Sequence, residues 1–101
     1  MREPPEGVLE VDTADGVVTV RGEIDRITID RVVHAVEQVR GVVVLQLDRV
    51  TFLDSSGLQG ILVAQQDARG RGGDVILRRP SHVVSRVLEI TGLRQAFVIE
   101  E

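Results

Sequence analysis

The sequence predicts an α/β fold, a single small domain in which a mixed sheet of four to five strands packs against about three helices. Short Val-rich runs alternate along the chain with segments whose apolar residues recur at helical spacing, a pattern typical of sheets covered by helices. The chain has two Phe and no Tyr or Trp, so aliphatic side chains must build the core. Branched aliphatic residues suit such a sheet, and 101 residues are enough for one core.

The first element is a predicted β-hairpin. Residues 8–13 and 17–20 are both strand-like, and Asp15-Gly16 lies between them. An Asp-Gly pair between two such runs is a strong hairpin signal because it favours the tight turn that antiparallel strands need. Residues 22–25 are expected to close the second strand.

A helix and a central strand are predicted next. The helix has either Asp25 or Thr28 as its N-cap and is expected to end at Gly41. Residues 42–47 are almost continuously apolar and rich in Val, which predicts a central strand covered on both faces. The apolar stripe of the helix consists of Ile29, Val32, Val33 and Val36.

Two further helix–strand units complete the predicted order β-β-α-β-α-β-α-β. A second helix stops at the Gly-rich segment 70–73 and leads to a strand at 75–77. Pro80-Ser81 precedes a third helix that ends at Thr91-Gly92, and residues 96–99 form a short last strand. The two helical stripes are Leu58, Ile61, Leu62 and Ala68, and Val83, Val84, Val87 and Leu88.

Composition narrows the function classes. The net charge of −4 disfavours direct binding to nucleic acid. The chain has no Cys, and His34 and His82 lack metal-ligand spacing, so we expect neither a metal nor a cofactor. No apolar run approaches the ~20 residues that span a bilayer, so we expect no membrane partner and a cytoplasmic location. Residues 1–7 are expected to be a flexible leader and residues 8–101 the folded domain.

Three predicted loops follow strands whose carboxyl ends can share one edge of the sheet. They are residues 25–28, 49–57 and 79–81. Sites usually form at that edge in α/β proteins. The topology therefore predicts that Asp25, Asp54, Ser55 and Ser81 can lie together, if the preceding strands are parallel.

The segment Asp54-Ser55-Ser56-Gly57-Leu58 allows two interpretations, which are compatible. Asp and Ser are preferred N-caps, so the cap is either Asp54 or Ser56, the latter with Gln59 completing a capping box. If Asp54 is the cap, both serines occupy the first turn of the helix. A helix N-terminus also favours added negative charge, so Ser55 is a candidate phosphorylation site.

Catalytic interpretations are weaker. The segment lacks the first Gly of a nucleophile elbow, although His82 could approach the same edge as a base. Asp25 and Asp54 could form a carboxylate pair for a metal, but both positions also suit helix caps. The Gly-rich segment 70–73 follows a helix and precedes a strand, the reverse of a phosphate-binding loop.

Taken together, these motifs resemble the STAS domain of bacterial anti-sigma factor antagonists over nearly the whole chain, from Val8 to Ile99. The resemblance rests on four segments: Gly22-Glu23-Ile24-Asp25, residues 44–58 with the Asp-Ser-Ser-Gly-Leu element, Gly72-Gly73-Asp74, and residues 87–93.

The resemblance implies partner switching, and hence a binding protein rather than an enzyme. In that family the unphosphorylated antagonist binds an anti-sigma factor that is also a serine kinase, which frees an alternative sigma factor, as in stress responses. Phosphorylation of the matching serine, here Ser55, breaks the complex, and a serine phosphatase resets the antagonist. The implied docking edge comprises Asp25, Asp54, Ser56, Gly57 and Leu58. The alternative is a STAS docking subunit of a signalling scaffold or transport complex without a phosphorylation cycle.

Overall fold

The structure is a computed structural model that describes residues 8–101, so the leader predicted at residues 1–7 lies outside the described residues. Five strands, three α-helices and one short 3₁₀ turn follow one another along these residues. Their bounds are β1 Leu9–Ala14, β2 Val17–Ile24, α1 Ile29–Glu37, β3 Val42–Leu53, α2 Ser55–Gly70, β4 Asp74–Arg78, α3 His82–Thr91, η1 Arg94–Ala96 and β5 Val98–Glu100.

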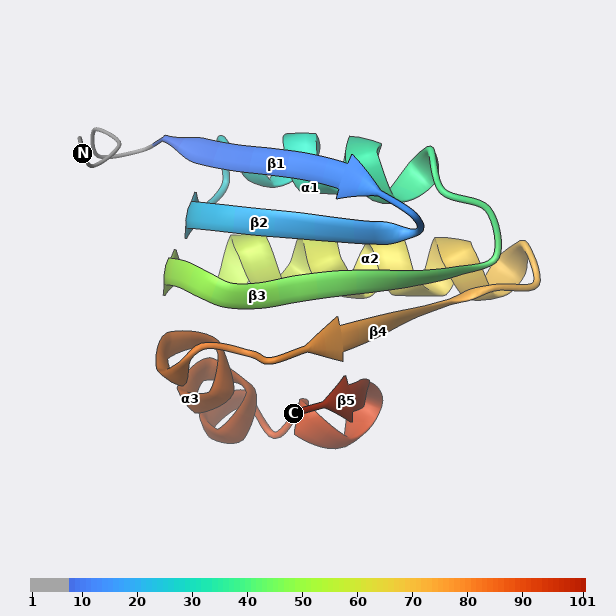
Figure 1. Ribbon diagram of the computed structural model, residues 1–101. Helices are drawn as coiled ribbons and strands as arrows, with labels where there is room; N and C mark the ends of the chain where they lie inside the picture. Colours follow the sequence, from blue (N-terminus) through green and yellow to red (C-terminus); the bar gives the residue numbers. More distant parts are fainter. Residues whose placement is uncertain (1–7) are drawn as a thin grey trace.

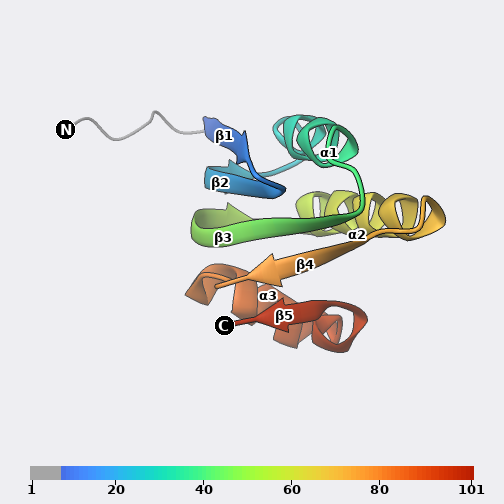
Figure 2. The same cartoon turned by 45° about the vertical axis from the view of Figure 1, so that its right-hand side comes forward.

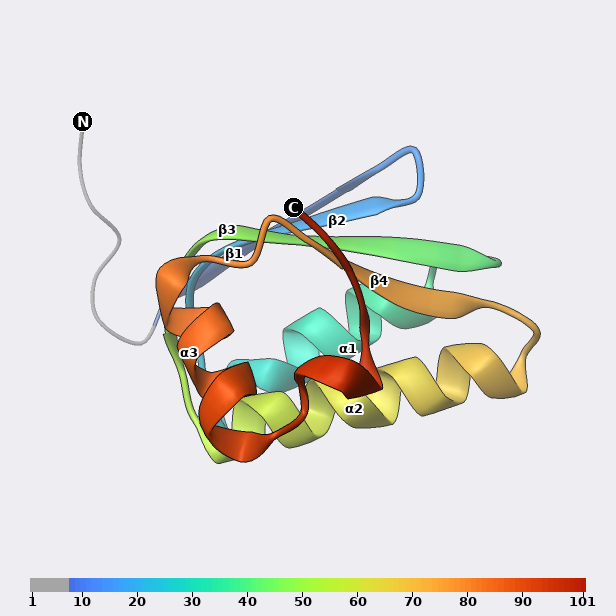
Figure 3. The same cartoon turned by 90° about the horizontal axis from the view of Figure 1, so that it is seen from below.

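The strands form one mixed sheet in the order β1-β2-β3-β4-β5. β1 is antiparallel to β2, and the other neighbouring pairs are parallel. All three helices lie on the same face of the sheet, as the views from the front and from below show (Figures 1 and 3). Figure 2 shows α1 and α2 stacked beside β1 to β3. The predicted fold class is confirmed.

The hairpin is confirmed with the turn chemistry that the sequence predicts. Asp15 and Gly16 both adopt positive φ angles, 53° and 78°. This left-handed pair forms the tight turn that matches the twist of the flanking strands. Ala14 consequently pairs with Val17, and the antiparallel register runs from there to Leu9 opposite Gly22.

The hydrophobic core lies between the sheet and the helix layer. Alternate residues of β2 point into it, and Phe97 is its one aromatic member among the described residues. The prediction that strand 42–47 is covered on both faces is wrong: Val42 is 52% exposed. All three helices pack on one face of the sheet (Figure 3), so the outward side chains of β3 stay uncovered by helices. A continuous apolar run therefore indicated the centre of the sheet but not a second helix layer.

Three predicted boundaries are corrected. β3 continues to Leu53 because its second half pairs with the end of β2, with two register shifts in the pairing. The predicted loop 49–57 thus shrinks to Asp54. α1 ends at Glu37, before Gly41, because the N–H groups that follow it bond to carbonyls three residues back. The last strand starts at Val98 because residues 94–96 form the 3₁₀ turn.

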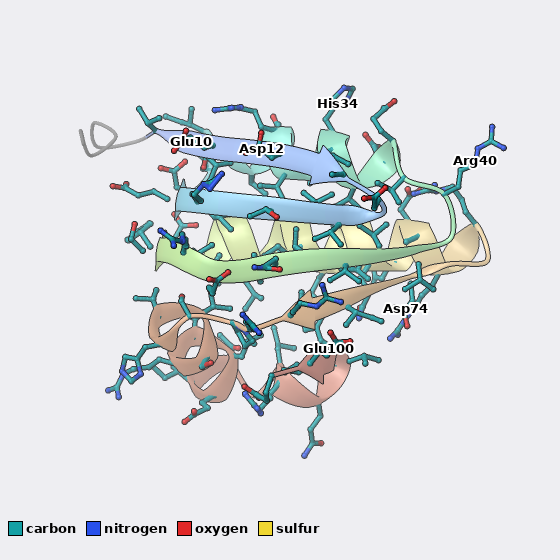
Figure 4. The ribbon with its side chains drawn as sticks, viewed as in Figure 1. Glu10, Asp12, His34, Arg40, Asp74 and Glu100 are labelled. Carbon is teal, nitrogen blue, oxygen red and sulfur yellow. The ribbon has the colours of Figure 1, made fainter. Side chains whose placement is uncertain are left out.

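Charged side chains lie on β1 and on the neighbouring α1. Figure 4 shows Glu10 and Asp12 on β1, and His34 projecting from α1 away from the sheet. Arg31 donates a hydrogen bond from Nη1 to the Leu9 carbonyl at 2.6 Å and so joins α1 to this edge. None of the described helices has the length and apolar character needed to cross a membrane.

Candidate functional site

Asp54 is the N-cap of α2. Its backbone is extended (φ −104°, ψ −178°), and its Oδ1 accepts a hydrogen bond from the Gly57 N–H at 2.8 Å. Its carbonyl accepts the first helical bond, from the Leu58 N–H at 3.0 Å. This geometry is that of a side-chain cap. It decides between the two predicted caps: Asp54 is correct, and Ser56 with its capping box is wrong.

Both serines therefore occupy the first turn of α2. Ser55 is the first helical residue and is exposed, whereas Ser56 is half-buried. The first N–H groups of a helix have no partner within the helix, and the helix dipole adds partial positive charge there. The Ser55 side chain is consequently accessible beside a helix terminus that favours negative charge.

Gly57 and Leu58 lie beneath the surface. Leu58 is 3% exposed and belongs to the core. A Cβ on Gly57 would lie 2.7 Å from the carbonyl oxygen of Ile24 and 2.8 Å from its Cγ2, so glycine allows α2 to approach the end of β2. Of the predicted docking edge, these two residues hold the edge in place. They are too buried to offer a contact surface of their own.

Asp25 organises the turn that follows β2. Its Oδ1 accepts hydrogen bonds from the N–H groups of Ile27 and Thr28, both at 2.9 Å. Thr28 is buried; its hydroxyl accepts from the Asp25 N–H at 2.9 Å and donates to the Glu23 carbonyl at 2.7 Å. Thr28 precedes α1 without a side-chain cap bond, so the turn is held by the Asp25 carboxylate.

These contacts also hold Asp25 in its ionised form. The hydrogen bond from the Thr28 N–H lowers the pKa of the Asp25 carboxyl below its ordinary value, whereas desolvation opposes this. The Ile27 N–H, the Thr28 hydroxyl and the positive charge of Arg26 lower the pKa further. Hydrogen bonds to a carboxylate favour the charged state, so Asp25 carries its negative charge at neutral pH.

The Asp25 turn and the start of α2 meet at one end of the sheet, the left end in Figure 1. The Asp54 N–H lies 3.4 Å from the Ile24 carbonyl that accepts its hydrogen bond. Between the two turns lies an open depression of about 360 Å³, lined by Asp25, Arg26, Ile27, Asp54 and Ser56. The sequence argument placed residues 25–28 at this edge but assigned no role to Arg26 or Ile27.

Ser81 does not join this group. β4 ends at Arg78 opposite Gln46, and the Ser81 N–H bonds to the Leu47 carbonyl at 3.1 Å. β3 runs on for six residues beyond Leu47, to Leu53, and Ser81 is not among the residues that line the depression. Ser81 instead caps α3, accepting a hydrogen bond from the Val84 N–H.

Neither histidine is hydrogen-bonded to Ser55 within the part of the chain that the structure describes. His34 and His82 are both exposed, and no hydrogen bond in the described part of the chain joins either of them to a serine. Over residues 8–101 no group of three or more His, Cys, Asp or Glu side chains is arranged to hold a metal ion.

Comparisons with known proteins point to one family. The family model described as the STAS domain matches residues 8–101. The anti-sigma-B factor antagonist of Listeria monocytogenes is 35% identical over 97 residues, which are 92% of this chain and 85% of that protein.

Solved structures agree. An anti-sigma factor antagonist from Mycobacterium paratuberculosis has a TM-score of 0.73 at 27% identity, with 92% of this chain and 84% of that chain covered. The anti-sigma factor antagonist SpoIIAA, in its unphosphorylated form, has a TM-score of 0.69 at 22% identity, with 93% of this chain and 89% of that chain covered. Phosphorylated SpoIIAA from Bacillus has a TM-score of 0.65 at 20% identity, with 93% of this chain and 92% of that chain covered. At these identities the two SpoIIAA structures show that the fold is shared.

Proposed function

This chain belongs to the STAS domain family of anti-sigma factor antagonists, and from that premise we propose that phosphorylation of Ser55 controls its binding to an anti-sigma factor. In its unphosphorylated form the protein binds an anti-sigma factor that is also a serine kinase, in the cytoplasm. That binding frees an alternative sigma factor for transcription. A serine phosphatase restores the binding form.

The observation that carries this proposal is the position of Ser55. It is exposed, it is the first residue of α2, and the cap Asp54 leaves its hydroxyl outside the capping hydrogen bond. In the modification, the Ser55 oxygen attacks the γ-phosphorus of ATP bound to the kinase, ADP leaves, and the hydroxyl proton is lost. The phosphatase uses water to return the hydroxyl and release phosphate.

The added phosphate acts mainly on the partner. It brings about −1.5 to −2 charges and three acceptor oxygens. The N-terminus of α2 favours this charge, whereas the carboxylates of Asp25 and Asp54, which line the depression at the start of α2, oppose it. Because the two effects offset each other, the fold changes little. A partner docked on this edge, however, must remove water from a dianion.

The test is incubation with each candidate anti-sigma kinase of the same genome and ATP, followed by mass spectrometry of the modified residue. The Ser55→Ala chain should bind the kinase and stay bound when ATP is added, and Ser55→Asp should bind more weakly. Ser56→Ala should still take up phosphate, which distinguishes the two neighbouring hydroxyls. Modification of Ser56 or Ser81 instead would move the site, and no modification by any kinase would favour a docking subunit without a phosphorylation cycle.

A further inference from the structure

Ile27 is an exposed aliphatic side chain that the fold does not use. It is 79% exposed, the highest value among the large exposed hydrophobic residues of the described chain. An isolated exposed aliphatic residue is common on protein surfaces. Ile27 differs in its surroundings, because it lies on a fixed turn that lines the depression at the Ser55 edge.

The turn that carries Ile27 is ordered before any partner arrives. The Ile27 N–H is bonded to the Asp25 carboxylate, and the next residue, Thr28, is buried with its hydroxyl bonded to the Glu23 carbonyl. Ordering of loops and side chains is a main cost of association. The backbone of this turn is already hydrogen-bonded in the free protein, so a partner has only the Ile27 side chain left to order.

Ile27 is also the one large aliphatic group among the residues that line the depression, the others being Asp25, Arg26, Asp54 and Ser56. The carboxylates of Asp25 and Asp54 already accept hydrogen bonds from the backbone of their own turns. Their main contribution to a contact with a partner is therefore their negative charge. Within the depression itself, apolar contact with a partner must therefore come from Ile27.

We propose that Ile27 is the apolar anchor by which the anti-sigma kinase holds this protein, inserting into a hydrophobic socket beside the kinase active site. The inference rests on the function proposed above and divides its tasks between two residues. Ile27 supplies affinity, since buried aliphatic and aromatic anchors dominate interface energies. Ser55 supplies control, since its phosphate places charge at the rim of the same contact.

A second copy of this chain is a poor occupant for this edge. Two copies meeting across it would bring the carboxylates of Asp25 and Asp54 of each copy together, and like charges at an interface repel. One aliphatic side chain also falls far short of the roughly 800 Å² per partner that stable interfaces bury. A kinase that already encloses Ser55 supplies the remaining contact area from its active site.

The experiment compares two exposed isoleucines. Ile27→Ala should raise the dissociation constant for the kinase at least tenfold, equal to about 1.4 kcal/mol. Ile90→Ala is the matched control: Ile90 is 75% exposed and lies near the end of α3, and this variant should bind within twofold of the parent. Ile27→Leu should restore most of the affinity. Calorimetric titration with the kinase that modifies Ser55, loaded with a non-hydrolysable ATP analogue, measures all four proteins.

Phosphorylation kinetics provide a second readout. Ile27→Ala should raise the KM for the antagonist while kcat stays within twofold, because a residue that only binds changes KM alone when dissociation outpaces phosphoryl transfer. Equal weakening by Ile27→Ala and Ile90→Ala, or no weakening by either, would overturn the anchor while leaving the Ser55 switch intact. If the parent protein binds no kinase, the proposed function fails and the anchor fails with it.

Discussion

Replacing Gly57 by alanine should destabilise the protein and disturb the edge that presents Ser55. The added Cβ would lie 2.7 Å from the Ile24 carbonyl oxygen and 2.8 Å from Leu53 Cδ1. The leucine can move, but the carbonyl belongs to the backbone of β2. Relief of the contact therefore requires the start of α2 to move away from the Asp25 turn.

The magnitude follows from two opposing effects. Overpacking a close contact typically costs about 1–3 kcal/mol. Alanine is a better helix former than glycine and returns up to about 1 kcal/mol. We expect a net loss of about 1–2 kcal/mol, and for a domain of this size each kcal/mol lowers Tm by roughly 4–8 °C.

The assay is thermal and urea unfolding of Gly57→Ala beside Gly70→Ala. Gly70 ends the same helix, and a Cβ there meets nothing within 4 Å, so its substitution should be neutral or slightly stabilising. The comparison cancels the difference in helix propensity. Equal stability of the two variants would show that the close approach between β2 and α2 does not constrain this edge.

Two further substitutions test the hydrogen bonds that shape the site. Asp54→Ala removes the acceptor for the Gly57 N–H and should cost about 1 kcal/mol in urea unfolding, whereas Asp54→Asn should retain most of the cap; equal losses would show that charge, and not capping, is what Asp54 contributes. The pKa of Asp25 is lowered in the folded protein, first by the Thr28 N–H. Its carboxylate therefore stabilises the fold above the unfolded-state pKa, and this stability is lost as pH falls below about 4. Asp25→Asn should flatten that part of the curve of urea midpoint against pH, and an unchanged slope would contradict the assignment.

Periodicity predicts the elements of this fold because the chain alternates cleanly between two kinds of pattern. The Val-rich runs and the helical stripes each bury one face, and the Asp15-Gly16 turn is local chemistry. The second half of β3 escaped prediction for a physical reason. Of residues 48–53 only Val50 and Leu53 are buried. Register shifts interrupt the pairing with β2, so the alternation of buried and exposed residues that marks a strand is lost there.

The site shows the same division between local and long-range information. The sequence is compatible with either Asp54 or Ser56 as the cap of α2. The backbone angles of the folded chain decide for Asp54. The separation of Ser81 from Ser55 depends on the unequal lengths of β3 and β4, a property of pairing between distant segments. Gly57 and Leu58 follow Ser55 directly, yet the helical turn directs them into the core. These residues closely follow the candidate phosphorylation site but are therefore not themselves exposed to a partner.

In the function proposed here, the arrangement at this edge would let one phosphate act without refolding the domain. The carboxylates of Asp25 and Asp54 accept hydrogen bonds from the backbone of their own turns, and each turn adjoins a buried residue, Thr28 in one and Leu58 in the other. A phosphate on Ser55 would thus lie beside turns whose carboxylates are already hydrogen-bonded to their own backbone. The free energy of removing water from this phosphate would then oppose the binding of a partner. In the function proposed here, a fixed turn that holds Ile27 and an exposed serine beside it would let affinity and its control be changed independently, so partner specificity can evolve without loss of the switch.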